Sequence, residues 1–346
     1  MLPAPNRLRL DTHALQDNWR ALARLSGAAA CGAAVKADGY GLGATGVVTR
    51  LAAAGCRDFF VATWREAAAL ADLVAAHDLR LSVLHGVRAA DMGHAVSARA
   101  RPVLNSAEQV ARWRAAGGGA CDVMVDTGMS RLGIAPEEVA GGLLDGLTID
   151  TLLSHLVAAE EDTTLNARQR AGLATVRDRA GARRVSLANS AGIALGPDYA
   201  FDLTRPGLSL YGGIARRELA DAIRPVATIE AEVLQCRTVR AGDTVGYNAT
   251  WTAPADTRVA TVNLGYADGY WRGFSDTGGA RAGDRVLRVI GRVSMDLVAV
   301  AIDGADVAEG DWLSFDPDLP RAAAASGMSQ YELLTGLGHR FDRMWG

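Results

Sequence analysis

The sequence has few of the features that are typical of membrane proteins, nucleic-acid-binding proteins or metal-binding proteins. Its four cysteines, Cys31, Cys56, Cys121 and Cys236, are widely spaced, with no C-x-x-C pair and no histidine at a metal-ligand spacing. No apolar stretch reaches the ~18 residues of a membrane-spanning helix. A formal net charge of −3 provides no basic surface for nucleic acid. We therefore expect no metal site, no membrane association and no nucleic-acid partner.

The scarcity of cysteine also bears on the compartment. Isolated cysteines are typical of small buried residues in a reducing environment rather than of a disulfide framework. Residues 1–10 lack the apolar core of a secretory signal. Both observations favour the cytoplasm. The chain of 346 residues is long enough for two domains, or for one barrel with an additional domain.

Short apolar runs alternate with helical patterns over the first ~215 residues. The runs are at residues 31–35, 59–62, 81–84, 102–104, 121–125, 149–153, 184–187 and 200–204. Eight is the number of strands in a closed parallel barrel, although an open doubly wound sheet would show the same alternation. After residue 213 the pattern changes to segments rich in Val, Ile and Thr, separated by Gly and Asp turns.

We therefore predict an α/β protein with two domains. Residues 1–217 form an N-terminal (β/α)8 TIM barrel, and residues 218–346 form a C-terminal, mostly β domain. In the second domain the predicted strands are residues 226–239, 257–264, 285–290 and 297–302. Within the first domain, residues 1–10 can pair with the β domain.

A lysine stands at the end of the first apolar run. Lys36 follows residues 31–35 directly, and Tyr40 with three glycines comes after it. Partial burial at a strand end disfavours the ammonium form and makes the neutral, nucleophilic amine more accessible, as a carbonyl-trapping lysine requires. A solvated lysine at a strand terminus is the alternative interpretation.

Other polar residues follow later runs, at the barrel end where such folds place their chemistry. They are Arg131, His155, Asn189, Ser190, Arg205 and Gly207. Ser190 opens a predicted short helix and Gly207 follows the eighth run, so both lie where barrel enzymes hold a phosphate on backbone N–H groups. Taken singly, Ser190 also fits an N-cap, Gly207 a turn and His155 a satisfied core histidine. Beside a lysine that can form an imine, a phosphate cradle implies pyridoxal phosphate.

Six motifs occur in the order and spacing found in the alanine racemases. They are residues 35–41 (VKADGYG), 126–133 (DTGMSRLG), His155 with residues 188–190 (ANS), 205–212 (RPGLSLYG), 265–269 (GYADG) and 291–296 (GRVSMD). The chain resembles this family over nearly its whole length. The resemblance implies a pyridoxal-phosphate enzyme that interconverts L-alanine and D-alanine and supplies D-alanine for cell-wall peptidoglycan.

The resemblance also implies roles for particular residues. Pyridoxal phosphate would be held on Lys36, in a head-to-tail homodimer whose active sites each take the partner's Tyr266 and the partner's Met295. The further implied cofactor ligands are Tyr40, Ser190, Gly207 and Leu208 at the phosphate, Asn189 beside them, His155 against the ring, Arg131 at the phenolic oxygen and Arg205 at the pyridine nitrogen. Arg131 and Met295 are the implied substrate-binding residues.

Racemisation requires an acid/base group on each face of the substrate, because the α-proton leaves from one face and a proton returns on the other. By the resemblance, Lys36 serves one face and Tyr266 the other. An unperturbed tyrosine has a pKa of ~10, so its use as a base requires nearby positive charge or hydrogen bonds. Arg205 is a permanent cation and would keep the pyridine nitrogen unprotonated.

The chain departs from the family pattern at two positions. Many members carry a carbamylated lysine where this chain has Met124, so Arg131 lacks its usual orienting partner. Near the C-terminus, residues 331–334 resemble the last family segment, and His339 stands where a phosphate-binding tyrosine is expected. We predict His339 as a further phosphate ligand.

Three alternatives remain open at this point. One is a racemase for serine or for a broader set of small amino acids. Another is a non-catalytic pyridoxal-phosphate carrier, which would have a barrel but no β domain, and residues 265–269 argue against it. The third is a barrel-type decarboxylase of basic amino acids, whose reactive cysteine and acidic specificity loop have no counterpart around Cys236.

Overall fold

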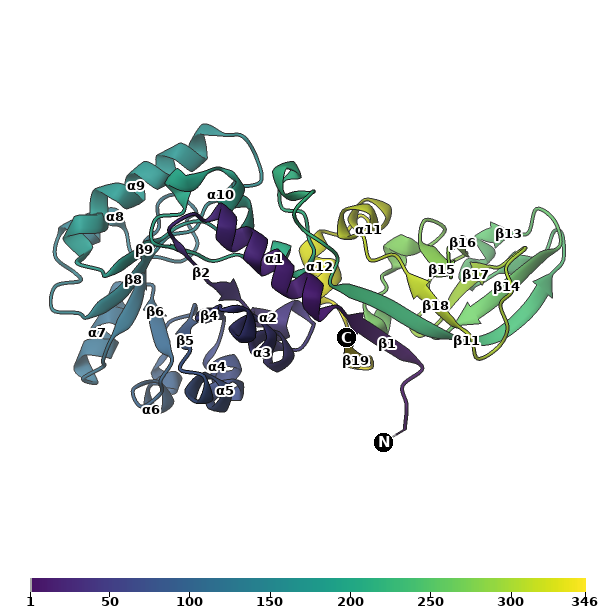
Figure 1. Ribbon diagram of the computed structural model, residues 1–346, viewed down its shortest axis with the longest axis horizontal. Helices are drawn as coiled ribbons and strands as arrows, with labels where there is room; N and C mark the ends of the chain where they lie inside the picture. Colours follow the sequence, from purple (N-terminus) through teal and green to yellow (C-terminus); the bar gives the residue numbers. More distant parts are fainter. Residues whose placement is uncertain (1) are drawn as a thin grey trace.

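The computed structural model describes residues 2–346 and shows a helix-covered barrel joined to an elongated β domain (Figure 1). The N-terminal segment connects them: β1 (Asn6–Leu10) lies in the sheet of the β domain, and α1 (Thr12–Leu25) packs on the barrel. Helix α1 begins where the side chain of Asp11 accepts a hydrogen bond from the backbone N–H of Ala14 (2.9 Å), a typical N-cap. Across residues 2–346 no helix has the length and apolarity needed to span a membrane.

The barrel consists of parallel strands that pair in sequence order from β3 to β9, with β10 and β2 completing the ring. The strands are β2 (Ala30–Cys31), β3 (Ala33–Ala34), β4 (Asp58–Val61), β5 (Arg80–Val83), β6 (Arg101–Leu104), β7 (Cys121–Met124), β8 (Ile149–Leu153), β9 (Arg184–Ser186) and β10 (Leu203–Thr204). β10 pairs with β2, and the backbone N–H of Asp202 donates to the carbonyl of Val185 (3.0 Å), which joins β10 to β9. β2 and β3 are one strand interrupted at Gly32. The predicted closed barrel is confirmed, and the open sheet is excluded.

Helices cover the outside of the barrel (Figure 1). They are α1, α3 (Ala44–Ala54), α4 (Trp64–Ala69), α5 (Ala71–Ala76), α6 (Met92–Ala95), α7 (Ala107–Ala115), α8 (Pro136–Ala140), α9 (Thr164–Ala180) and α10 (Ser190–Ala194). The short element α2 (Lys36–Tyr40) is instead a turn at the carboxyl-terminal end of the barrel. Apolar periodicity and N-capping residues explain where most of these helices form. For example, Ser106 is the N-cap of α7, and its hydroxyl accepts from the N–H of Gln109.

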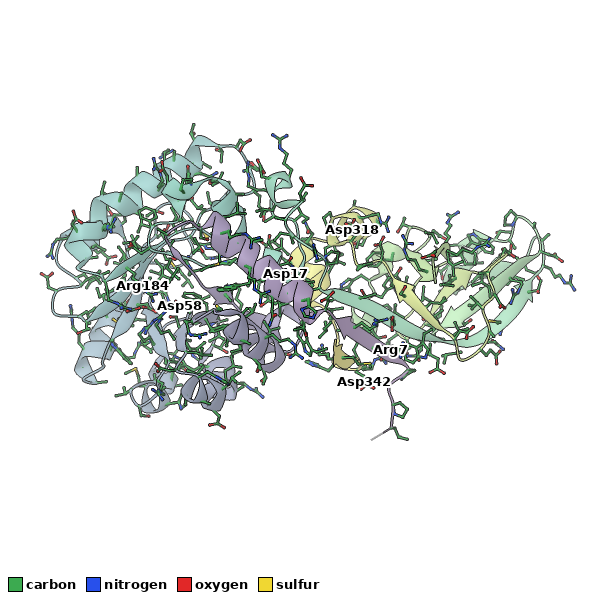
Figure 2. All side chains as sticks on the ribbon, viewed as in Figure 1. Arg7, Asp17, Asp58, Arg184, Asp318 and Asp342 are labelled. Atoms are coloured by element: carbon green, nitrogen blue, oxygen red, sulfur yellow. The ribbon has the colours of Figure 1, made fainter. Side chains whose placement is uncertain are left out.

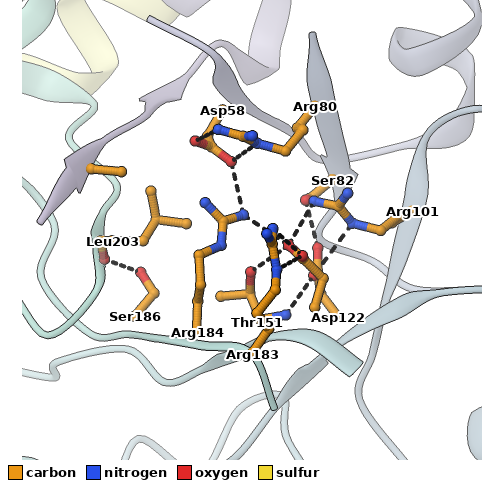
Figure 3. Close-up of polar contacts among 12 residues, drawn as sticks. Asp58, Arg80, Ser82, Arg101, Asp122, Thr151, Arg183, Arg184, Ser186 and Leu203 are labelled. Carbon is orange, nitrogen blue, oxygen red and sulfur yellow. Dashed lines mark hydrogen bonds and ion pairs between the residues drawn. The ribbon is translucent and has the colours of Figure 1, made fainter. Parts of the chain in front are cut away.

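A buried ion network closes the amino-terminal end of the barrel (Figures 2 and 3). The guanidinium of Arg184 contacts the carboxylates of Asp58 (2.9 Å) and Asp150 (2.8 Å). Asp58 also accepts two hydrogen bonds of 2.8 Å from Arg80. Asp58 is buried, and its charge is paired with both guanidinium groups, which avoids the large cost of a lone charge in the interior.

An apolar layer lies one step further along the barrel axis. Its members are Phe60, Val103, Met124, Leu153 and Leu203. Phe60 follows Asp58 by two residues on β4, so it points into the barrel at the next level. This layer separates the ion network from the carboxyl-terminal end of the strands, where the barrel opens.

The β domain is a single antiparallel sheet that also takes up both ends of the chain. Its strands are β1, β11 (Ala227–Val239), β14 (Thr257–Val262), β15 (Gly279–Ala282), β16 (Arg285–Ile290), β17 (Val298–Ala301), β18 (Trp312–Phe315) and β19 (Asp342–Trp345), with the small hairpin β12 (Thr244–Val245) and β13 (Trp251–Thr252) beside them. β11 is long enough to pair with β1 and β18 at one end and with β14 at the other. The parallel pairing of β1 with β19 is the exception to the antiparallel order.

Two short helices, α11 (Leu319–Ser326) and α12 (Gln330–Thr335), lie between the barrel and the β domain (Figure 1). The C-terminal strand β19 reaches the barrel too, because the guanidinium of Arg343 donates to the carbonyl of Gly41 (2.8 Å). The junction is therefore built directly against the turn that follows Lys36.

Candidate active site

A cavity of about 750 Å³ opens at the carboxyl-terminal end of the barrel strands. Its walls include nine of the residues predicted from the sequence: Lys36, Tyr40, Arg131, His155, Asn189, Ser190, Arg205, Gly207 and Leu208. They come from the segments that follow five different strands, which the barrel brings to one place.

Lys36 enters the cavity from an unusual left-handed turn. Residues 37–41 all have positive φ, with values of 52, 52, 64, 55 and 85°. Each non-glycine residue in this conformation costs roughly 1–2 kcal/mol, so the turn must be held by its surroundings. The Asp38 carboxylate accepts from the N–H of Ala44 (2.8 Å), and the N–H of Gly41 donates to the carbonyl of Ala37 (2.9 Å).

Lys36 is also the only lysine in the chain, although lysine and arginine together number 36. Burial lowers the pKa of its ammonium group, the cation of Arg131 lowers it further, and the carboxylate of Glu66 opposes both. A lowered pKa favours the neutral amine that attacks a carbonyl. The position of Lys36 at a strand end did not by itself show that the chain has no other lysine for this role.

A cluster of donors lies on one side of the cavity. The hydroxyl of Ser190 accepts from the N–H groups of Gly207 (3.0 Å) and Ser209 (3.2 Å), while the buried hydroxyl of Ser209 has no partner within residues 2–346. A Cβ on Gly207 would lie only 2.3 Å from the hydroxyl of Tyr40, so glycine is required for this approach. Burial raises the pKa of Tyr40 to about 12, which keeps its hydroxyl a donor. Hydroxyl and backbone donors of this kind fit a phosphate group.

Helix α10 is capped by Asn189, not by Ser190. The Asn189 side chain accepts from the N–H of Gly192 (2.8 Å), which leaves the Ser190 hydroxyl facing the loop of Gly207. The simple N-cap interpretation of Ser190 is therefore wrong. Asn189 lines the cavity, but its side-chain oxygen already accepts the hydrogen bond from Gly192.

Tyr40 is held by a second aromatic residue that the sequence analysis did not single out. The rings of Tyr40 and Tyr211 stack, with centroids 4.6 Å apart and an angle of 21° between them. The Tyr211 hydroxyl donates to the carbonyl of Ala34 (2.7 Å) and is fully buried. Tyr211 falls inside the motif at residues 205–212, which was the only available signal.

Arg205 and His155 lie deeper in the cavity. Arg205 is buried and donates to the carbonyl of Ser154 (2.6 Å) and to the hydroxyl of Ser186. Burial lowers its pKa to about 10, so it stays a cation near neutral pH. Burial, followed by the charges of Arg205, Arg131 and Lys36, lowers the pKa of His155 to about 3, so its imidazole is neutral.

Comparison with known proteins decides the family. The family model described as alanine racemase, N-terminal domain, matches residues 10–215, and the model for the C-terminal domain matches residues 226–345. The chain is 43% identical to an alanine racemase of Acidiphilium cryptum over 97% of this chain and 98% of that protein. It is 41% identical to an alanine racemase of Rhodospirillum rubrum, over 98% and 95%. The chain belongs to the alanine racemase family.

Solved structures of alanine racemases have the same fold. One, from Bartonella henselae, is described with covalently bound pyridoxal phosphate; it has a TM-score of 0.90 and 32% identity, covering 99% of this chain and all of that one. Another, from Pseudomonas aeruginosa, has a TM-score of 0.89 and 30% identity, with complete coverage of both chains. The match to both family domains excludes a single-barrel carrier.

The departure from the usual alanine racemase pattern at Met124 has a structural counterpart. Met124 is buried in the apolar layer beneath the cavity, so no anion stands there to hold Arg131. The loop that carries Arg131 is shaped instead by Asp126, which accepts from the N–H groups of Gly128 and Met129 (2.8 Å each). Burial opposes the charge of Asp126, but these donors outweigh it and lower its pKa.

Two residues predicted for the alanine racemase site, Tyr266 and Met295, lie outside this cavity. They are neighbours in the β domain: the N–H of Tyr266 donates to the carbonyl of Ser294 (3.1 Å), and that of Ala267 to Met295 (3.0 Å). The side chain of Met295 is 53% exposed. The guanidinium of Arg272 lies 5.1 Å from the centre of the Tyr266 ring and supplies a nearby positive charge.

His339, predicted as a phosphate ligand, also lies outside the cavity, with its side chain exposed. Besides Tyr40, the cavity wall contains Tyr331 on α12. The ring centres of these two tyrosines are 6.4 Å apart. Its hydroxyl donates to the carboxylate of Glu160 (3.3 Å). The fold therefore brings Tyr331, rather than His339, to the cavity wall. Within residues 2–346 no group of three or more His, Cys, Asp or Glu is arranged to hold a metal ion.

Proposed function

We propose that this chain is an alanine racemase that uses pyridoxal phosphate on Lys36 and two opposed acid/base groups to interconvert L-alanine and D-alanine. The observation that carries the proposal is the single cavity lined by nine predicted residues, with the chain's sole lysine at one wall. The names of the relatives support the substrate, and the solved structure with covalently bound pyridoxal phosphate supports the cofactor.

When bound, pyridoxal phosphate supplies an electron sink that stabilises the carbanion formed by loss of the α-proton. Tyr40, Ser190, Gly207 and Leu208 would hold its phosphate group in the donor cluster, with Asn189 beside them. His155 is a neutral imidazole that would lie against the cofactor ring, so it adds no second cation next to Arg205.

Arg205 would face the pyridine nitrogen of the bound cofactor and, as a cation, would disfavour protonation there. Arg131 would donate to the phenolic oxygen of the cofactor and would contribute to substrate binding with Met295. Lys36 exchanges the α-proton at one face of the substrate. Tyr266 would exchange it at the other face, with the guanidinium of Arg272 over its ring.

Tyr266 and Met295 reach the cavity from a second copy of the chain, in a head-to-tail homodimer. Support comes from their position: both lie on the β domain, away from this chain's own cavity, and Met295 is largely exposed. A single chain therefore presents one acid/base group in its cavity, and two chains complete two sites.

The proposal includes the wider setting. The barrel domain comprises residues 1–217 and the β domain residues 218–346, with β1 contributed to the sheet of the second. The enzyme works in the cytoplasm and supplies D-alanine for peptidoglycan. Its four cysteines are free, as a reducing compartment would maintain them.

The test of the cofactor lysine uses the fact that no other lysine exists. Borohydride reduction in the presence of pyridoxal phosphate is expected to attach the cofactor to the peptide that contains Lys36, as read by mass spectrometry. The Lys36→Ala chain is expected to lose both this adduct and the visible absorbance of the cofactor. A Lys36→Ala chain that keeps the absorbance band and racemises alanine would refute the assignment.

A further inference from the structure

Glu66 makes contacts in the cavity that none of the assigned roles uses. It is the third residue of α4, in the motif T-x-x-E that begins at Thr63. One carboxylate oxygen, Oε2, accepts from the N–H of Ala62 (2.8 Å) and the N–H of Thr63 (2.9 Å), which is the ordinary capping-box contact of a helix start. The other oxygen is not needed for the cap.

The second oxygen of Glu66 crosses to the neighbouring strand. Oε1 accepts from the N–H of Ala37 at 2.7 Å, and Ala37 directly follows Lys36. The parallel pairing of β3 with β4 ends just before, where the N–H of Val35 donates to the carbonyl of Phe60 (2.8 Å). Ala37 N–H is the next donor on that edge, and the left-handed turn carries it away from the ladder. The Glu66 carboxylate takes the place of the missing strand partner.

The turn at one end of this contact and the carboxylate at the other both affect Lys36. The turn at residues 37–41 is strained, so its anchors decide whether the lysine is held in one direction. Glu66 also lines the same cavity as the lysine amine. The other charged or titratable groups in that cavity wall are Tyr40, His85, Asp126, Arg131, His155, Arg205 and Tyr331. Among these groups Glu66 is the carboxylate bonded to the lysine's own turn.

We propose that Glu66 is a positioning residue for Lys36: one oxygen caps α4, while the other fixes the left-handed turn after the lysine and places a negative charge beside it. This inference rests on the proposed role of Lys36 as the cofactor lysine. It explains why a carboxylate, rather than an amide, suits this position, since every partner of Glu66 is a donor.

The substitution Glu66→Gln separates this role from helix capping. Glutamine keeps the capping box through its amide oxygen. Its amide N–H₂ then faces the N–H of Ala37, donor against donor, and the negative charge is gone. Glu66→Asp keeps the charge but is one methylene shorter, so it cannot span both turns. Glu138→Gln is the matched control, because Glu138 also accepts from the N–H at the start of its helix (3.0 Å, from Ala135) and is exposed.

Because the chain has one lysine, selective ¹³C-lysine labelling of the full chain freed of cofactor gives a single lysine resonance to titrate. We expect Glu66→Gln to lower the pKa of Lys36 by about one unit, since the anion that favours the ammonium has been removed. Glu66→Asp should restore most of that pKa, and Glu138→Gln should not change it. An unchanged Lys36 pKa in Glu66→Gln would overturn the electrostatic part of the proposal.

Hydrogen exchange at the Ala37 amide tests the anchoring part. Exchange is expected to be about tenfold faster in both Glu66→Gln and Glu66→Asp than in wild type or Glu138→Gln, as a lost charged hydrogen bond implies. Equal protection in all four chains would overturn the anchoring part. These measurements need no bound cofactor, so they can fail while the borohydride result stands, or the reverse.

Discussion

At the scale of single residues, the approach of Gly207 to Tyr40 is the tightest steric constraint on the proposed phosphate site. A Cβ at position 207 would lie 2.3 Å from the Tyr40 hydroxyl. Gly207→Ala is therefore expected to displace Tyr40 and weaken pyridoxal phosphate binding at least about tenfold, a loss of roughly 1.4 kcal/mol. Titration of visible absorbance measures it. Gly119→Ala, where a Cβ meets nothing within 4 Å, should bind as wild type does. Equal affinities would contradict this use of Gly207.

His155 predicts a pH dependence at the same scale. Its pKa is about 3 in the folded chain and ~6.5 when unfolded, so between these values only the unfolded state binds the proton. The contribution of His155 to the free energy of unfolding is fully present above pH ~6.5. It decreases as the pH drops toward 3, by up to about 1.4 kcal/mol per pH unit. Denaturant unfolding between pH 4.5 and 6.5 should show a shallower dependence for His155→Gln than for His77→Gln. Parallel curves for the two variants would contradict it.

At the scale of elements, the ion network that closes the amino-terminal end of the barrel separates stability from chemistry. Asp58→Ala leaves Arg80 and Arg184 without their shared carboxylate, and removal of one partner of a buried pair costs about 3–5 kcal/mol. The exposed pair of Asp145 with Arg179 serves as the control, where Asp145→Ala should cost at most about 1 kcal/mol. Urea unfolding measures both.

The apolar layer at Phe60 and Met124 lies between that network and the cavity. Folded Asp58→Ala protein is therefore expected to keep the pyridoxal phosphate affinity of wild type. A loss of cofactor affinity in step with stability would show that the layer does not insulate the site.

The elements also show what the sequence could and could not predict. Periodicity and capping located α1 and α7 closely, because Asp11 and Ser106 are strong N-caps. The continuous helical pattern of residues 65–76 indicates one helix, but these residues form α4 and α5, broken at Leu70. The first predicted strand is likewise interrupted at Gly32. Apolar patterning carries little information about such breaks.

The candidate site was predictable to the extent that its residues follow strands. Lys36 and Arg205 stand directly after apolar runs, and the barrel gathers such positions. Tyr331 was not chosen, since it enters the cavity from a helix distant in sequence. Glu66 was not noticed either, because a capping-box glutamate gives no sign of a second contact across strands.

At the scale of the whole molecule, the proposed dimer predicts complementation between two inactive chains. Lys36→Ala lacks one acid/base group and Tyr266→Phe the other. If each site takes Lys36 from one chain and the partner's Tyr266, a mixed dimer holds one intact site, and random mixing restores about a quarter of wild-type activity. Unfolding and refolding the two variants together, followed by a racemisation assay, measures this. Activity that stays at the level of the separate variants would place both groups in one chain.

The proposed function requires that this chain racemise alanine at the cavity around Lys36. The most direct test is the time course of L-alanine with the purified holoenzyme in deuterated water, alongside serine and larger amino acids. Racemisation at this cavity predicts approach to equal amounts of the two alanine enantiomers, deuterium at the α-carbon of the product, slower turnover of larger side chains, and no conversion by Lys36→Ala. Absence of D-alanine from the wild-type reaction, or conversion that persists in Lys36→Ala, would contradict it.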